Sequence, residues 1–301
     1  MTFGTALNRT TSFDERGRVR REFWAPCGSD RTDRVAAAAG QSAAYVRYQT
    51  VGGRPTSHTP REPERIHWSS LLSTPQNRLI ELLPGRDRQR LLSLADLVRL
   101  TQSDVLGEIG KATRFVYFPV DGFISLITAI ESKPVLEVGM VGREGMFGVQ
   151  AASGVLTQPL HALVQGPGSA QRIGLSAFSR ELQRGAALRR ILGRYSYVLM
   201  SQLASSAACI RFHSIDARLG RRLLMMQDRA HADSFGGTHE FMAHMLGVRR
   251  VSITDAAGVM QRNGLIEYHR GQVTVLDREG LEAATCTCYT AERQAYSRVM
   301  H

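Results

Sequence analysis

The stretch THEFMAHMLGVRRVSITDAAGVMQRNGLIEYHRGQVTVL, residues 238–276, joins two helical patterns to a hairpin pattern. Thr238 is a residue type that caps helix N-termini, so it predicts the start of a first helix. Gly247 predicts a sharp turn at the end of that helix, because glycine adopts left-handed backbone angles without steric cost. A second helix, from about residue 249 to 260, is predicted by apolar residues at three- and four-residue steps: Ile253, Ala256 and Met260.

The segments NGLIEY, HRGQ and VTVL that follow predict a two-stranded hairpin. Helix, turn, helix and hairpin in this order form a winged helix-turn-helix, whose second helix enters the major groove of DNA. An αα-hairpin in an enzyme would not need arginines at the start of its second helix and at the hairpin tip. The candidate DNA-binding residues are Arg249, Arg250, Val251, Ser252, Thr254, Asp255 and, as a phosphate contact, Arg270.

The net charge of +11 over 301 residues favours an anionic partner such as nucleic acid. Nearly all the cations are arginine, since Lys111 and Lys133 are the only lysines, so the type of cation carries little information. No apolar run reaches the roughly 20 residues that cross a bilayer, and the N-terminus has no apolar signal core. We therefore expect a cytoplasmic protein without a membrane partner.

The region from about residue 98 to 175 has the pattern of short strands separated by glycine and proline. RFVYFPVDGFISLIT places Asp121-Gly122 among β-branched and aromatic residues, which predicts a hairpin there. Several such strands indicate a β-sandwich or jelly-roll barrel. A short helix, ended by Pro84-Gly85, is expected before this region.

From Ser176 to about Ala230 the pattern is helical. A heptad row favours a partner helix and hence a homodimer, although one helix packed on its own domain remains an alternative. The row, and so the expected dimer interface, consists of Leu188, Leu192, Tyr195, Leu199, Gln202 and Ser206.

The chain resembles the Crp/Fnr family of bacterial transcription regulators, because that family has a strand-rich barrel, a long helix and a winged helix-turn-helix in the same order. The resemblance runs from about Leu79 to Leu281 and is most specific in MLGVRRVSITDAAGVMQRNGLIEYHRGQVTVLDREGLEA. It implies a homodimer on palindromic double-stranded DNA, RNA polymerase as a further partner, and an effector in the barrel. It also implies that the signal passes through the long helix.

The segment VGREGMFGVQ, residues 141–150, resembles the family's glycine turn but lacks its ligand chemistry. Where the family has a glutamate for the ribose, this chain has Val149, and where it has an Arg-Ser pair for the cyclic phosphate, this chain has Leu160 and His161. The apolar Val149 and Leu160 cannot pair with an anion, so we expect no cyclic-nucleotide binding. We expect Arg143 and Glu144 at the loop surface, paired with each other or with solvent. The degenerate effector pocket consists of Gly148, Val149, Leu160 and His161.

The sequence thus predicts an α+β fold with an N-terminal jelly-roll barrel resembling cyclic-nucleotide-binding domains. The expected parts are a disordered or poorly ordered extension (1–70), the sensory barrel with flanking helices (71–187), a dimerisation helix (188–212), the winged helix-turn-helix (213–285) and a C-terminal tail (286–301).

No cofactor, metal or catalytic site is expected. The four cysteines, including Cys286 and Cys288, have no C-x-x-C spacing. His239 and His244 are five residues apart, whereas a zinc-hydrolase helix needs four. Two alternatives stay open: a regulator without ligand control, and a jelly-roll small-molecule or metal-dependent enzyme with a helical tail.

Overall fold

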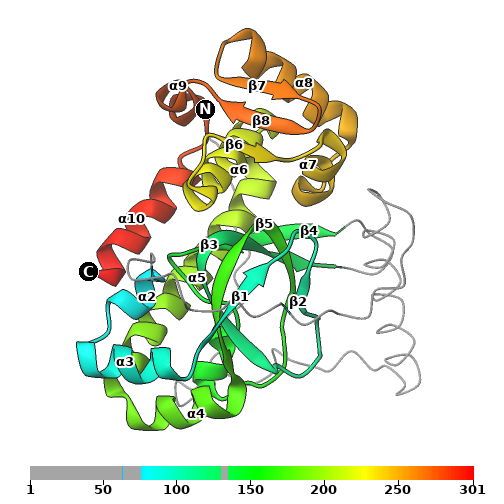
Figure 1. Ribbon diagram of the computed structural model, residues 1–301. Coiled ribbons are helices and arrows are strands. Elements are labelled where there is room, and N and C mark those ends of the chain that lie inside the picture. Colours follow the sequence, from blue (N-terminus) through cyan, green and yellow to red (C-terminus); the bar gives the residue numbers. More distant parts are fainter. Residues whose placement is uncertain (1–62, 64–75, 130–134) are drawn as a thin grey trace, which may run out of the picture.

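The computed structural model describes residue 63, residues 76–129 and residues 135–301 (Figure 1). The expected N-terminal extension, residues 1–70, lies outside the described residues except for residue 63. The described chain contains an antiparallel sheet, then long helices, then a smaller domain of helices and strands. The predicted α+β class with a strand-rich first half is confirmed. None of the helices in the described ranges is long and apolar enough to span a bilayer.

Two short helices, α2 (Arg78–Glu81) and α3 (Gly85–Ser93), precede the sheet. Asn77 fixes the first of them, because its side-chain oxygen accepts a hydrogen bond from the Leu79 amide at 2.9 Å. The same side chain donates to the Gly145 carbonyl at 2.7 Å. The helices are thereby attached to the loop that contains VGREGMFGVQ.

The large sheet has the order β1-β5-β3-β4, with β2 paired to β5, and every pairing is antiparallel. Its strands are β1 (Asp96–Leu100), β2 (Val105–Gly107), β3 (Phe115–Thr128), β4 (Leu136–Val141) and β5 (His161–Gly174). Between β4 and β5 a short 3-10 helix, η1 (Val149–Ser153), closes one side of the core.

The hairpin predicted at Asp121-Gly122 is wrong. Strand β3 continues through this pair, and its register against β5 shifts on both sides of it. Gly122 has φ +70°, so the residue forms a bulge that bends the strand. Glycine with a positive φ occurs in turns and in bulges, so the Asp121-Gly122 pair alone does not distinguish them. Because β3 pairs with β5 on both sides of Gly122, the pair forms a bulge.

The helical segment consists of α4 (Leu175–Arg184), α5 (Ala186–Phe212) and α6 (Ile215–Ala230). The row predicted as the dimer interface instead packs inside the protomer, which corrects that assignment. Leu188, Leu192 and Tyr195 are buried with the barrel residue Met146, and Leu199 is partly buried there.

The two polar members of that row also have partners within the chain. The Gln202 side-chain oxygen accepts a hydrogen bond from the Met140 amide of β4 at 3.1 Å. The Ser206 hydroxyl oxygen accepts one from the Arg221 guanidinium of α6 at 3.1 Å. Gln202 and Ser206 therefore bind partners on β4 and α6. The heptad argument had placed them between two helices of a dimer instead.

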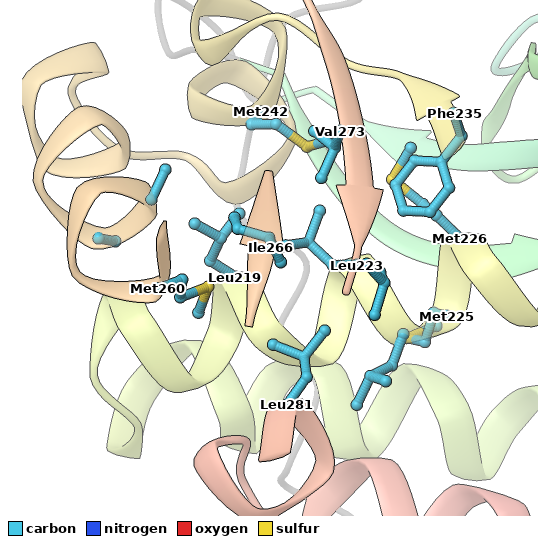
Figure 2. Close-up of a cluster of buried hydrophobic side chains, with 14 of the residues drawn as sticks. Leu219, Leu223, Met225, Met226, Phe235, Met242, Met260, Ile266, Val273 and Leu281 are labelled. Atoms are coloured by element: carbon cyan, nitrogen blue, oxygen red, sulfur yellow. The ribbon is translucent and has the colours of Figure 1, made fainter. Parts of the chain in front are cut away.

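The C-terminal domain is built on the inner face of α6. Its remaining elements are β6 (Ser234–Gly236), α7 (His239–Leu246), α8 (Arg250–Arg262), β7 (Ile266–His269), β8 (Gln272–Val275) and α9 (Arg278–Ala284). Figure 2 shows Leu219 and Leu223 of α6 meeting Met260, Ile266, Val273 and Leu281 in one core. The sheet has three strands in the order β6-β8-β7, so the predicted two-stranded wing gains an extra strand.

The segment expected as a C-terminal tail, residues 286–301, contains helix α10 (Cys288–Met300). Figure 1 shows α10 leaving the C-terminal domain and running back beside the first half of the molecule. Met300 is buried in the same cluster as Leu192 and Tyr195 of α5. Helix α10 therefore connects the C-terminal domain to the barrel side of the protein.

Candidate nucleic-acid interface

Helices α7 and α8 meet at a tight turn that the sequence specifies locally. The Thr238 hydroxyl accepts a hydrogen bond from the Phe241 amide at 3.1 Å and caps α7. Gly247 has φ +64° at the other end, and the Val248 amide donates to the Ala243 carbonyl at 3.0 Å. These bonds satisfy the free carbonyls of α7 and direct the chain into α8.

Helix α8 has one face in the core and one outside. Ile253, Ala256 and Met260 are buried, as predicted. The Arg250 side chain is 69% exposed and Val251 is 60% exposed. Among the other predicted residues of this helix, Ser252 is half-buried, whereas Arg249, Thr254 and Asp255 are exposed.

Two contacts hold the outer face of α8 to α7. The Arg250 guanidinium lies 3.9 Å from the Glu240 carboxylate. The Thr254 hydroxyl lies 3.0 Å from His239 Nδ1 and donates to the Arg250 carbonyl at 3.2 Å. Burial, and secondarily Arg250, lowers the pKa of His239, which favours the neutral ring as a partner of the hydroxyl.

The strands β7 and β8 form the wing beside this face. Arg270 and Gly271 have φ +47° and +81°, the positive pair required by a tight two-residue hairpin turn. Arg270 is exposed at the tip of the wing. The predicted turn and its arginine are thus present, and Figure 1 shows α8 and the wing at the end of the molecule remote from the large sheet.

Sequence reasoning missed the pair that joins the wing to the helices. The rings of His239 and Tyr268 pack with centroids 4.2 Å apart. The Tyr268 hydroxyl donates to the Gly237 carbonyl, and burial raises the pKa of Tyr268 to about 12, so the hydroxyl keeps its proton. The residues are 29 positions apart along the chain, and their types alone give no signal of this contact.

The four predicted effector-pocket residues lie in different surroundings. Val149 is buried in the cluster beneath α5, after Gly148 with φ +92°. Leu160 packs in a separate cluster with Val141. His161 is buried at the start of β5, and burial lowers its pKa, an effect that Glu108 partly offsets. Val149 and Leu160 therefore belong to two different apolar clusters of the described chain.

A cavity of about 720 Å³ opens elsewhere, between the barrel loop, α5, α6 and α10. Arg143 and Glu144 line it, and neither has the surroundings expected from the sequence. The Arg143 guanidinium pairs with Glu81 at 2.7 Å, and the Glu144 carboxylate pairs with Arg229 of α6 at 2.8 Å. Both charges are therefore used to join separate parts of the chain and do not pair with each other.

Comparison with known proteins gives a family match for the C-terminal domain. The Crp-like helix-turn-helix domain matches residues 217–284, which run from α6 to α9. A comparison with curated proteins gave no match.

Several solved structures share the fold. A Crp/Fnr-family regulator from Eubacterium rectale has 16% identity and a TM-score of 0.55, covering 68% of this chain and 96% of its own. FixK2 from Bradyrhizobium japonicum has 14% identity and a TM-score of 0.55, covering 64% and 98%. A CRP/FNR-family regulator from Thermus thermophilus has 20% identity and a TM-score of 0.52, covering 62% and 97%.

Proposed function

We propose that this chain, a Crp/Fnr-type transcription regulator by its Crp-like helix-turn-helix domain and its fold, reads a two-fold symmetric DNA site as a homodimer. The observation that carries the proposal is the exposed N-terminal turn of α8 with Arg249 and Arg250, together with the exposed Arg270 at the tip of the wing. A recognition helix presents this turn to base edges, and a wing reaches the phosphates alongside.

Within that turn we assign direct base contacts to Arg249 and Arg250, with Val251, Ser252, Thr254 and Asp255 as neighbours on the same surface. An arginine that donates two hydrogen bonds to guanine contributes about 1–3 kcal/mol of discrimination. A phosphate contact from Arg270 contributes affinity without sequence preference. In a homodimer the two recognition helices would read half-sites about 34 Å apart.

The test uses the full chain and DNA sites selected from a random-sequence pool at about 150 mM salt, because phosphate contacts weaken steeply as salt rises. We expect Arg249→Ala or Arg250→Ala to lower affinity for the selected site about 5- to 150-fold, with little change on unselected DNA. The matched control is Arg262→Ala, at the exposed far end of α8. Equal binding of selected and unselected DNA by the unaltered chain would contradict the proposal.

The outer face of α5 supports homodimerisation better than the inner row predicted from the sequence. Tyr197 and Met200 are 54% and 59% exposed, although both are large and apolar. Exposed small residues continue their row at steps of three and four: Gly193, Ala204, Ala207 and Ala208. Small and large side chains at this spacing suit close packing against a second copy of the same helix.

The barrel, in this proposal, does not bind a cyclic nucleotide. Val149 and Leu160 stand in apolar clusters, and a phosphate there would be buried without a partner. The regulator then responds to another effector or to none, and RNA polymerase remains a proposed partner. A ligand that binds only the folded protein raises its melting temperature, so cyclic AMP and cyclic GMP are expected to leave it unchanged.

A further inference from the structure

Four side chains of metal-binding type meet at the junction between the long helix and the C-terminal helix. Cys209, His213, Cys286 and Cys288 each offer one ligand atom, and these atoms all lie within 4.8 Å of one another. The Cys209 and Cys286 sulfurs are 3.5 Å apart. The Cys288 sulfur is 3.6 Å from His213 Nδ1. Along the sequence Cys286 and Cys288, one residue apart, are too few ligands to specify a site, and the fold adds Cys209 and His213 from a distant segment.

The two segments present their ligands in fixed positions. Cys209 and His213 are four residues apart, at the last turn of α5 and its C-cap, so they lie on one side of the helix. Cys286 precedes α10 and Cys288 is the first residue of α10. Cys209 and Cys286 are buried, whereas Cys288 and His213 are partly exposed, which leaves an approach for an ion from one side.

The distances fit one tetrahedral ion. With bonds of about 2.3 Å to sulfur and about 2.0–2.1 Å to nitrogen, the ligand atoms of such an ion stand roughly 3.5–3.8 Å apart. The Cys209–Cys286 and Cys288–His213 separations, 3.5 Å and 3.6 Å, fall at the lower end of that range. The most distant pair, at most 4.8 Å apart, closes by up to about 1 Å when the ion binds. A cluster of several irons separates its thiolates further, so the geometry favours a single ion.

The charges around the cluster suit bound thiolates. Three thiolates, one neutral histidine and a divalent cation carry a net charge of −1. The buried Arg221 guanidinium, which also pairs with Glu292, lies close enough to interact with all three cysteines, and Arg218 interacts with two of them.

We propose that Cys209, His213, Cys286 and Cys288 bind one zinc-class divalent ion per chain, and that this ion joins the end of α5 to the start of α10. On binding, the three thiols release their protons and the imidazole coordinates through the unprotonated Nδ1. The site stands at the connection between the long helix and the DNA-binding domain, since α6 begins two residues after His213. This inference does not depend on DNA binding.

The test is metal analysis of the untagged full chain, purified under reducing conditions without chelator and incubated with zinc. We expect one zinc per chain, and zinc X-ray absorption that shows three sulfur neighbours at about 2.3 Å and one nitrogen at about 2.0–2.1 Å. Cobalt in place of zinc should give the intense thiolate absorption of a tetrahedral Co(II) site. These measurements use the unaltered chain, so they hold even where a variant fails to fold.

Variants then assign the ligands. We expect Cys286→Ser and Cys288→Ser to lower the affinity for zinc at least 10-fold, and Cys27→Ser, the remaining cysteine, to leave it unchanged. A reduced chain that takes up no zinc overturns the proposal, as does coordination by oxygen and nitrogen alone. So does wild-type affinity in both serine variants, or a Cys209–Cys286 disulfide whose reduction restores no metal uptake.

Discussion

Gly247 is the residue on which the helix-turn-helix depends most directly. Its φ of +64° is costly for any residue with a Cβ, and an added Cβ would stand 3.0 Å from Leu136 Cδ1 of the barrel. We expect Gly247→Ala to lower the free energy of unfolding by about 1–2 kcal/mol, because a left-handed conformation costs this much for L-residues. Urea denaturation followed by circular dichroism measures the change.

Gly236 is the matched control. An added Cβ there meets nothing within 4 Å, and its φ is not in the left-handed region. Gly236→Ala should therefore change the free energy of unfolding by a few tenths of a kcal/mol at most, as surface substitutions usually do. If the two alanine variants unfolded at the same urea concentration, the turn at Gly247 would not carry the strain assigned to it.

Residue-scale signals were read correctly where the deciding interactions are local. The Thr238 cap, the Gly247 turn and the Arg270-Gly271 wing turn all satisfy backbone needs within a few residues. Asp121-Gly122 shows the limit of such signals. Its positive φ is present as expected, but pairing with β5 over the length of β3 makes it a bulge.

At the scale of a single element, the proposed dimer contact on the outer face of α5 can be tested. Tyr197→Glu and Met200→Glu would each bury a carboxylate in the proposed helix pair, and an unpaired buried charge is very costly. We expect both variants to be monomeric at the micromolar concentrations at which, by our proposal, the unaltered chain is dimeric. Size-exclusion chromatography with light scattering measures the mass directly.

Leu156 provides the control for this element, since it is a large apolar residue with 51% exposure outside α5. Leu156→Glu adds the same charge to the surface and should leave the dimer intact. Substitution in the inner row, such as Leu192→Ala, should instead destabilise the fold by about 2–5 kcal/mol. A dimer that survives both glutamate variants would show that the chains associate elsewhere.

Helix α5 also shows why the sequence could place a helix but not its faces. Two rows of heptad spacing run along it, and periodicity alone does not say which row meets the barrel. The barrel determines which row is buried, because the Met140 amide of β4 donates a hydrogen bond to Gln202 on the inner row. A polar residue in a heptad row can therefore indicate a partner strand as well as a partner helix.

At the scale of the whole molecule, the sequence predicted the order of the parts but not the contacts between them. Cys209 and Cys286 are 77 positions apart, and their sulfurs meet only because α10 returns to α5. Likewise, the surface position expected for Arg143 and Glu144 did not foresee their partners Glu81 and Arg229, which lie far away in sequence. Such contacts depend on how domains dock, and no local pattern encodes that.

A buried ion pair joins the barrel to the DNA-binding domain: Glu137 in β4 and Arg222 in α6. Arg222 also lies over the Phe241 ring of α7, at 5.5 Å, so it touches both sides of the interface. Glu137→Gln keeps the shape of the side chain but leaves the guanidinium charge buried without its counter-charge. We expect a loss of about 3 kcal/mol in the free energy of unfolding, measured by urea denaturation.

The paired variant Glu137→Leu with Arg222→Met separates charge from packing. It removes both charges together and restores most of that stability, because replacing a buried pair by apolar groups is often nearly neutral. If the double variant were as unstable as Glu137→Gln, the instability of the double variant would come from the changed side-chain shapes and from the lost hydrogen bond that Ser125 donates to Glu137. If Glu137→Gln cost less than about 1 kcal/mol, the interface would be held by its apolar contacts, such as Met245 against Leu163. The DNA-binding domain would then be held on the barrel by apolar contacts, which removal of the Glu137 charge leaves in place.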